Sequence, residues 1–281
     1  MLDEGRRSTV KEIITKYKRE PDFEKTIYVE GSTDKTLIKW FLKQAKIKNI
    51  VVNKIDDIEI DIDEVFKLGL DNNARSRVIT LTTLIENHII GIIDSDFDFI
   101  SEPSYPHKDT LCKTDYACME MYCFNEDTLE KILLGYEESK QPADFKSYKL
   151  MLSEILIELF LIRYAKDSIV KDLKKLDFNK SLTLKSQNII FNRDKYLQNY
   201  VSNKTELVEE FNKFIHTLKS KIPTDVRKMA NGHDFTSLMQ FYLGIKQGKE
   251  VFEKSLYSSL EFDKLKEEEM FKKLLSLLVS I

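Results

Sequence analysis

Apolar positions along residues 26–114 follow two alternating patterns. Short runs of apolar, β-branched and aromatic residues end at a glycine or an acidic residue, and these runs predict buried strands. Between them, apolar residues recur every three or four positions, as in Leu37, Ile38, Phe41 and Leu42, which predicts amphipathic helices. The patterns predict strands over residues 26–30, 49–55, 88–93 and 110–114, and helices over residues 32–46 and 73–86.

The order of these elements predicts an α/β fold, with a mostly parallel sheet flanked by helices and right-handed crossovers. From Ile58 to Ile62, apolar and acidic residues alternate, which predicts a half-buried strand or an edge ribbon. Beyond residue 125 the strand signal fades, and a mainly helical C-terminal region is expected. Helical spacing covers residues 150–164, 205–219, 235–244 and 265–279. With the boundary placed in 137–145, the domains are residues 1–140 and 141–281.

Composition narrows the class of protein. Only 8 glycines and 5 prolines occur among 281 residues, which argues against a many-stranded β-sandwich and for long helices. No apolar run approaches the roughly 20 residues that span a bilayer, and the charged N-terminus does not resemble a signal peptide. Cys112, Cys118 and Cys123 lack the spacing of a disulfide framework or a zinc site. We therefore expect a cytoplasmic protein with no membrane partner.

The formal net charge of −3 is unevenly distributed. Residues 1–140 carry 20 basic and 28 acidic side chains, whereas residues 141–281 carry 24 and 19, so the halves stand at −8 and +5. Such a split indicates two functional surfaces, although charges scattered over solvated helices would produce the same numbers.

Carboxylates follow two of the predicted strands. Glu30 closes the first strand, and Asp94, Asp96 and Asp98 follow the third. In an α/β fold, chemistry takes place beyond the carboxyl ends of the strands, where neighbouring strands would bring these acids within a few ångströms. A cluster of like charges stays ionised only with a counter-cation, and carboxylate oxygens without nearby Cys or His suit Mg²⁺ or Mn²⁺. Each motif alone also has a structural interpretation. Glu30 would be a surface acid at a strand end, and the Asp94–Asp98 segment would be a solvated turn or a helix cap.

The segment Tyr28-Val-Glu-Gly-Ser-Thr-Asp-Lys35, followed by Gly91-Ile-Ile-Asp-Ser-Asp96, resembles the motifs of a Toprim domain. This is the fold of primases, type II topoisomerases and overcoming-lysogenization-defect nucleases. The resemblance implies that Glu30 is a metal ligand or general acid/base, and that Asp94 and Asp96 are metal ligands. It also implies that Gly31 lets the backbone approach the substrate closely.

A narrower resemblance involves Thr114-Asp115-Tyr116, Glu120 and Asn231-Gly232-His233-Asp234. These motifs are similar to those of Toprim effectors that are paired with ATPases in anti-phage loci, notably the PARIS system. The resemblance implies a metal-dependent endonuclease that an ABC-type ATPase partner keeps silent and releases on infection. It further implies an active homodimer and an RNA target, with transfer RNA favoured over DNA.

Further candidates each have a structural alternative. Glu120 follows the fourth predicted strand, as does Asp115, and would complete the acidic pocket or bind a second metal; a helix-surface acid is the alternative. Lys35 lies one turn into the first helix, where it would bind a phosphate. The alternative is that it is an ordinary solvated lysine. His233, with Asp234, would orient a substrate or a helical lid; a structural histidine or a helix N-cap is the alternative.

Nucleic acid is held largely by positive charge, because neutralised phosphates supply most of the non-specific affinity. Lys174 and Lys175 are the leading substrate-binding candidates. They belong to one of two basic clusters: Lys171, Lys174, Lys175, Lys180 and Lys185, and Lys219, Lys221, Arg227 and Lys228. Tyr196 and Tyr200 would stack on bases if they face a groove. Ordinary exposed lysines are the alternative.

Two other functions compete with a nuclease. The chain could be a non-catalytic docking subunit for an ATPase, or a phosphatase that uses Asp94 as its nucleophile, although such enzymes usually carry Thr or Val where Asp98 stands. A calcium loop starting at Asp94 is excluded, because Phe99 and Tyr105 occupy its Gly and Glu positions.

Overall fold

In a computed structural model of the chain, the described residues are 7–19, 25–85, 88–138, 141–170, 173, 176–202 and 204–279. The chain divides into two compact units. Unit 1 comprises residues Met1–Ser95, Glu102–Asp115 and Glu261–Ile281, and unit 2 comprises Asp96–Ser101 and Tyr116–Leu260. The backbone therefore passes between the units after residues 95, 101, 115 and 260.

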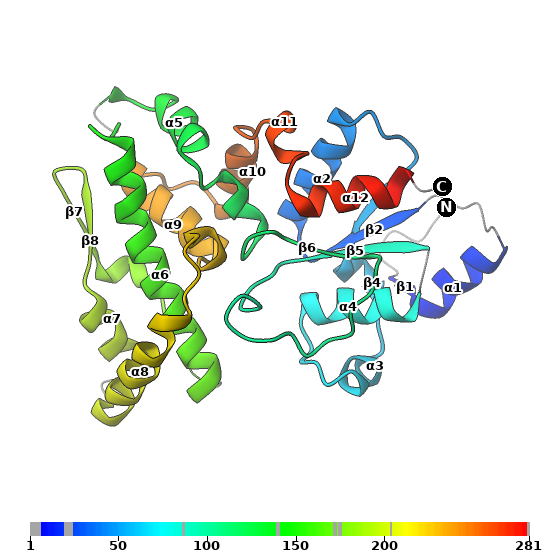
Figure 1. Cartoon of the computed structure of the whole chain (residues 1–281), viewed down its shortest axis with the longest axis horizontal. Coiled ribbons are helices and arrows are strands. Elements are labelled where there is room, and N and C mark those ends of the chain that lie inside the picture. The colour runs from blue at the N-terminus through cyan, green and yellow to red at the C-terminus, as the bar shows by residue number, and fades with distance from the viewer. Residues whose placement is uncertain are drawn as a thin grey trace. The chain divides into compact units, whose positions relative to one another are not determined.

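Unit 1 is an α/β structure (Figure 1). Its elements are β1 (Ser8–Thr9), α1 (Val10–Arg19), β2 (Thr26–Val29), α2 (Ser32–Gln44), β3 (Val51–Lys54), β4 (Ile58–Glu59), α3 (Ile62–Lys67), α4 (Ala74–Leu84), β5 (Ile89–Ile93), β6 (Leu111–Lys113), α11 (Phe262–Leu265) and α12 (Glu269–Val279). A 3₁₀ turn, Ile55–Asp57, joins β3 to β4. The small β1–β4 pair is parallel, like every pairing of the main sheet.

The main sheet has the strand order β3-β2-β5-β6. Its two central strands are buried along their whole length, which explains why their sequences are continuous apolar runs rather than alternating patterns. The register pairs Thr26 with Ile89 and Tyr28 with Gly91. At Gly91 the space for a side chain is taken, because a Cβ would lie 2.3 Å from Thr82 Oγ1 and 2.9 Å from Val78 Cγ1 of α4.

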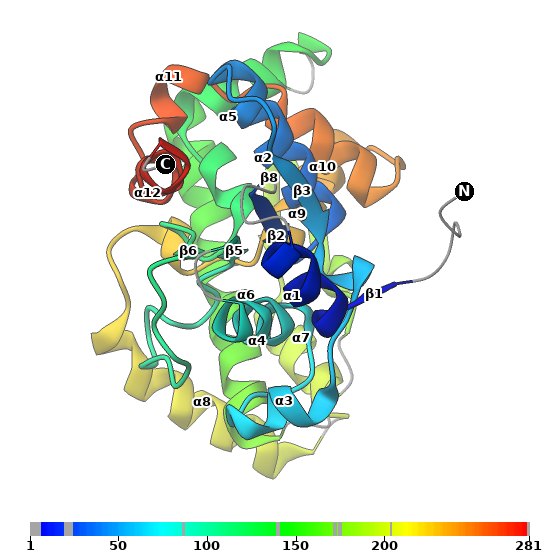
Figure 2. The same cartoon turned by 90° about the vertical axis from the view of Figure 1, so that its right-hand side faces the viewer.

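Helices cover both faces of this sheet. Figures 1 and 2 show α2 and α12 on one face and α1 and α4 on the other. Because side chains alternate along a strand, Tyr28 and Ile89 face α4 and enter one apolar cluster with Ile13 of α1 and Val78 of α4. On the opposite face, Phe41 of α2 packs against Phe271 of α12, with ring centroids 4.4 Å apart.

Unit 2 is mainly helical. Its elements are η2 (Met119–Cys123), α5 (Glu126–Leu134), α6 (Phe145–Ile169), η4 (Phe178–Ser181), β7 (Leu182–Lys185), β8 (Asn188–Phe191), α7 (Arg193–Tyr200), α8 (Thr205–Leu218), η5 (Lys219–Lys221), η6 (Val226–Lys228), α9 (Gly232–Leu243) and α10 (Lys249–Tyr257). The long helix α6 begins at the N-cap Asp144 and packs against α5, α8 and α9. Its buried face is formed by leucine, isoleucine and aromatic residues.

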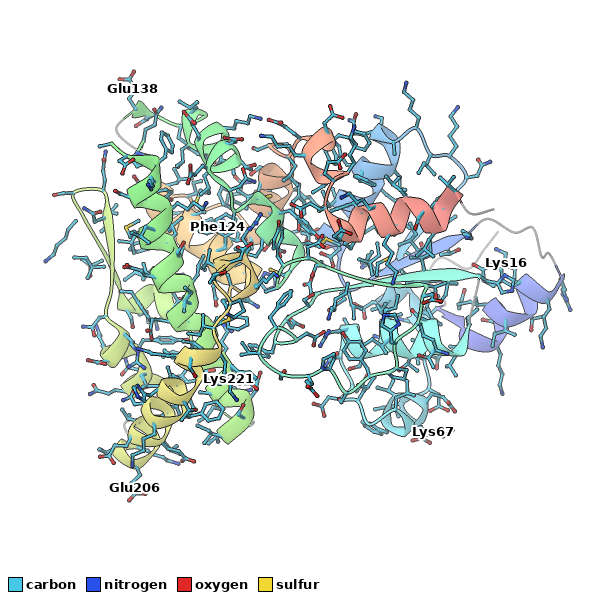
Figure 3. The ribbon with its side chains drawn as sticks, viewed as in Figure 1. Lys16, Lys67, Phe124, Glu138, Glu206 and Lys221 are labelled. Carbon is cyan, nitrogen blue, oxygen red and sulfur yellow. The ribbon has the colours of Figure 1, made fainter. Side chains whose placement is uncertain are left out.

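Aromatic residues fill the interior of unit 2. Phe124 is fully buried and meets Phe235 of α9 edge-to-face, with ring centroids 5.3 Å apart. Figure 3 shows Phe124 among the helices of this unit, whereas the charged residues Glu206 and Lys221, both of the same unit, are exposed. The hydrophobic periodicity of the sequence therefore corresponds to real packing in both halves of the chain.

The prediction of an α/β fold with a mostly parallel sheet flanked by helices is confirmed. The region from Ile58 to Ile62 is different from the predicted strand, because pairing stops at Glu59 and Asp61 caps α3 by accepting a hydrogen bond from the Asp63 amide at 3.0 Å. The mainly helical second half also contains the antiparallel hairpin β7–β8. In place of one boundary at residue 140, the units interleave, and the C-terminal helix α12 belongs to unit 1.

Candidate functional site

Glu30 and Asp94 meet at the carboxyl edge of the main sheet. Strands β2 and β5 are parallel neighbours, so both chains emerge from the sheet at the same edge. Glu30 Oε1 accepts a hydrogen bond from the Asp94 backbone N–H at 2.9 Å. The first predicted carboxylate is therefore held directly against the turn that carries the second.

The turn after β5 is fixed by its neighbour β6. Ser95 is buried, its amide donates to Thr114 Oγ1 at 2.9 Å, and its hydroxyl donates to the Thr114 carbonyl. The Thr114 amide in turn donates to the Ile93 carbonyl at 3.0 Å. These bonds explain why a serine separates the two aspartates, and they hold Asp94 in place without using its side chain.

Asp96 and Asp98 belong to unit 2, whereas Glu30 and Asp94 belong to unit 1. The Asp96 amide donates to the Ala117 carbonyl at 2.8 Å, and Asp96 adopts a left-handed backbone conformation with φ of 44°. Asp and Asn tolerate this region better than most residues, and such conformations cluster at functional sites.

Gly31 and Lys35 lie at the start of α2. Gly31 is the N-cap, and its amide donates to Asp34 Oδ2 at 2.9 Å. Its φ of −131° is open to any residue, and a Cβ would make only an ordinary 3.4 Å contact with Asp34, so the fold does not require glycine here. Lys35 Nζ lies 3.6 Å from Asp57 Oδ2, an ion pair that occupies the side chain predicted to meet a phosphate.

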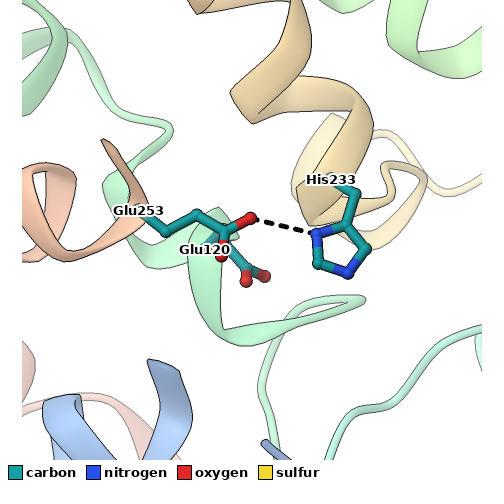
Figure 4. Close-up of side chains that lie close together, drawn as sticks. All are labelled: Glu120, His233 and Glu253. Carbon is teal, nitrogen blue, oxygen red and sulfur yellow. Dashed lines mark hydrogen bonds and ion pairs between the residues drawn. The ribbon is translucent and has the colours of Figure 1, made fainter. Parts of the chain in front are cut away.

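Glu120 lies in unit 2 and forms a cluster with His233 and Glu253. Glu253 is not among the residues predicted from the sequence. One potential ligand atom of each residue lies within 4.8 Å of the others, so the cluster could hold a metal ion. His233 Nδ1 is 3.0 Å from Glu253 Oε1 (Figure 4). The two carboxylates lie side by side in Figure 4, and they come from η2 and α10, while the imidazole comes from the first turn of α9.

Gly232 shapes this cluster. A Cβ at this position would lie 2.0 Å from Glu120 Oε2 and 2.9 Å from Cys118 Sγ. Any side chain here would have to displace the Glu120 carboxylate, which also forms a hydrogen bond with Cys118. Glycine in the Asn231–Asp234 motif therefore fits close packing within unit 2.

The electrostatics of the cluster are unusual, because two carboxylates are buried together. Glu120 is 6% exposed and Glu253 is 2% exposed. Burial raises the pKa of Glu120, and the nearby charge of Glu253 raises it further. The hydrogen bond to Glu253 raises the pKa of His233. Two unit charges this close repel by roughly 3–4 kcal/mol at an effective dielectric constant of about 20, so the cluster favours an added cation or proton.

The remaining residues of the Asn231–Asp234 motif have structural roles. Asn231 caps α9 by accepting a hydrogen bond from the His233 amide at 3.1 Å. Asp234 is almost completely buried and accepts two hydrogen bonds from the Arg163 guanidinium, one of them from Nε at 2.6 Å. This bidentate ion pair joins α9 to α6.

Several other candidates have defined positions. Asp115 accepts hydrogen bonds from the Met270 amide at the start of α12, so it caps that helix. Tyr196 and Tyr200 are buried and pack against each other, so neither ring is exposed for stacking on a base. Lys174 and Lys175 lie outside the described residues, as does Lys171.

The sequence contained no clear signal for Glu253 or Arg163. Glu253 lies in a charged segment, Lys249–Tyr257, where nothing distinguishes it from its exposed neighbours. Its burial becomes apparent only when α10 packs against α9 and η2. Comparison of the chain with models of known protein families gives no match, and comparison with curated proteins gives none. Within the described ranges, no helix is long and apolar enough to cross a membrane.

Proposed function

We propose that this protein is a metal-dependent nuclease of the Toprim type, with Glu30, Asp94 and Asp96 as its catalytic carboxylates. The observation that carries the proposal is the hydrogen bond from the Asp94 amide to Glu30 Oε1 at the carboxyl edge of an all-parallel sheet. It joins the two motifs on which the Toprim resemblance depends, although they are separated by 64 residues.

The donor set suits Mg²⁺ or Mn²⁺, because hard carboxylate oxygens are the ligands these ions prefer. We assign Glu30, Asp94 and Asp96 as ligands, with Asp98 as an additional candidate. When bound, such an ion would stabilise phosphoryl-transfer charge and activate water. Glu30 would also serve as general acid or base, since one of its oxygens is positioned by the Asp94 amide.

The glycine at position 31 supports the proposal that a substrate approaches the backbone closely there. Neither its backbone conformation nor its packing requires glycine. A side chain here would, however, stand between a phosphate backbone and the N-terminus of α2, where the helix dipole favours an anion. Lys35 would assist if a phosphate displaces its 3.6 Å ion pair with Asp57.

The biological setting is proposed from the motif resemblance. We propose an RNA substrate, with transfer RNA favoured, and an ABC-type ATPase partner that restrains the nuclease until infection. Active protein would be a homodimer in the cytoplasm, and its release would be an abortive anti-phage response. Lysines of residues 141–281, including Lys174 and Lys175, would supply the phosphate contacts.

The test is cleavage of total cellular RNA and of supercoiled plasmid by the purified chain with Mg²⁺, with Mn²⁺ and with EDTA. The proposal predicts metal-dependent loss of RNA, with little nicking of plasmid. Cleavage in EDTA, or no cleavage of either substrate, would contradict it and favour a docking subunit. Phosphate trapped covalently on Asp94 would instead favour a phosphatase.

A further inference from the structure

We propose that Glu120, His233 and Glu253 form a binding site for one Zn²⁺ ion within unit 2. This site shares no residue with the Glu30–Asp94 edge, and its occupancy can be measured without any cleavage assay. Its three donors come from η2, α9 and α10, and their ligand atoms lie within 4.8 Å of one another. Three elements that are distant in sequence therefore present one donor each to the same point.

The geometry of the donors suits a first-row transition metal. His233 Nδ1 and Glu253 Oε1 are 3.0 Å apart. Two ligands at about 2.0–2.1 Å from a tetrahedral ion are roughly 3.3–3.4 Å apart, so these two atoms would need to separate by only a few tenths of an ångström. The contact is a hydrogen bond in the present structure, and an ion bound between these atoms replaces the shared proton.

The chemistry of the donors selects Zn²⁺ over Mg²⁺ or Ca²⁺. Mg²⁺ and Ca²⁺ take oxygen ligands, whereas an imidazole with carboxylates is a zinc-type donor set. Zn²⁺ also binds more tightly than Mn²⁺ to a given mixed nitrogen and oxygen site. Unit 2 thus carries a donor set different from the all-carboxylate set of the Glu30–Asp94 edge.

A second observation points to a cation independently of the distances. Glu120 and Glu253 are both more than nine-tenths buried, although each carries an ionisable carboxyl group. Gly232 and Cys118 pack closely against the Glu120 carboxylate. The charged neighbours of His233 are Glu253, Glu120 and Lys249. A dication neutralises both carboxylates and needs only a neutral imidazole.

The site is open on one side. The His233 side chain is 54% exposed, whereas the Glu253 side chain is 3% exposed. Solvent therefore reaches the imidazole, and an ion would enter the site from that side. Three protein ligands with an open fourth position are the arrangement of zinc sites that keep an exchangeable water, rather than of closed structural sites.

The test is Zn²⁺ binding by the EDTA-stripped full chain, followed by competition with a chromophoric chelator. We expect one saturable site and at least a tenfold loss of affinity in Glu120→Gln, His233→Asn and Glu253→Gln. The matched control Glu250→Gln alters an exposed carboxylate of α10 and should bind Zn²⁺ like the wild type. Absence of saturable binding, or wild-type affinity in all three variants, would overturn the proposal, as would an equal loss in Glu250→Gln.

A second measurement uses the wild-type protein, so it tests the site even if the variants fail to fold. His233 is exposed enough to react with diethyl pyrocarbonate, and mass spectrometry reports the extent of modification at each histidine. Zn²⁺ should slow modification of His233 at least tenfold and leave exposed His107 unchanged. Equal rates at His233 with and without Zn²⁺ would overturn the proposal.

Discussion

Gly232 shows how one missing side chain can determine a local arrangement. Its hydrogen atoms lie where a Cβ would overlap the Glu120 carboxylate, so the first turn of α9 packs directly on a buried acid. The same contact brings His233, the next residue, to Glu253. Local packing at a glycine thereby builds the cluster that we assign to Zn²⁺.

Replacing Gly232 should therefore destabilise the protein. Gly232→Ala places a methyl group 2.0 Å from Glu120 Oε2, and overpacking of this kind costs roughly 1–3 kcal/mol. The matched control is Gly248→Ala, because Gly248 has φ of −59° and no atom within 4 Å of its would-be Cβ. Urea unfolding should show a reduced midpoint for Gly232→Ala alone. Equal midpoints for the two variants would contradict the packing account.

Arg163 and Asp234 form a bidentate ion pair in which both side chains are largely buried. Asp234→Ala leaves the partly buried Arg163 without its partner, and breaking such pairs costs about 3–5 kcal/mol. The double variant Arg163→Met with Asp234→Leu replaces the pair by apolar groups and should recover most of that stability. Urea unfolding of both variants tests this, and a double variant no more stable than Asp234→Ala would argue against it.

At this scale, sequence patterns located Glu30 and Asp94 because strand ends are marked by an abrupt change from apolar to acidic residues. Glu253 and Arg163 have no such mark. Their burial depends on helix–helix packing, which is set by contacts distant in sequence. The role of Gly232 was similarly hidden, because a glycine pattern does not reveal which atom occupies the space of its Cβ.

At the scale of elements, helix ends are set by short polar contacts. Asp144 caps α6, accepts hydrogen bonds from the amides of Lys146 and Ser147, and also accepts one from the Ser147 hydroxyl. The Ser147 hydrogen bonds lower the pKa of Asp144 below its usual value. The carboxylate form is therefore favoured in the folded state.

Asp144→Ala should lower the melting temperature by about 2–4 °C at neutral pH, because α6 loses its N-cap. A lowered folded-state pKa contributes stability above the unfolded pKa, and this is lost as pH falls through the folded value. The difference from wild type should therefore shrink below about pH 4. Asp144→Asn keeps an amide-oxygen cap and should show a smaller difference at neutral pH. A difference that is the same at pH 3 and pH 7 would contradict this origin.

Helix α12 is distant in sequence from the sheet that it covers, but its packing contribution should be large. Phe271 is fully buried against Phe41, and Phe271→Ala should cost about 3–5 kcal/mol. The control Val279→Ala alters an exposed residue of the same helix and should change stability by less than about 0.5 kcal/mol. Thermal unfolding distinguishes them, and similar melting temperatures would exclude α12 from the core of unit 1.

Most elements were predictable because their apolar spacing matches the structure, notably β2, β5, α4 and α8. The predictions missed α10, which is a short helix rich in charged residues, and the hairpin β7–β8, whose strands are only four residues long. The alternation from Ile58 to Ile62 indicated a longer strand, but capping by Asp61 converts its end into helix. Local polar contacts therefore overrode the hydrophobic pattern there.

At the scale of the whole molecule, the chain builds an α/β unit and a mainly helical unit by passing between them several times. Periodicity showed both classes of structure, but a helix pattern at residues 265–279 contains nothing that assigns α12 to the sheet. The charge difference of −8 against +5 belongs to the two halves of the sequence and not to the two units, because unit 1 carries 22 basic and 25 acidic residues and unit 2 carries 22 of each. At this scale, the proposed activity assigns metal-dependent phosphodiester cleavage to Glu30 and Asp94.

The most direct test is the initial rate of Mg²⁺-dependent RNA cleavage by the wild type, Glu30→Gln, Asp94→Asn and the control Asp263→Asn. Glu30→Gln keeps an oxygen that can accept the Asp94 amide hydrogen bond, and Asp263 is an exposed carboxylate of the same unit. We predict that Glu30→Gln and Asp94→Asn each lose at least about 100-fold in rate, while Asp263→Asn cleaves at the wild-type rate. Wild-type rates in both Glu30→Gln and Asp94→Asn would contradict the claim.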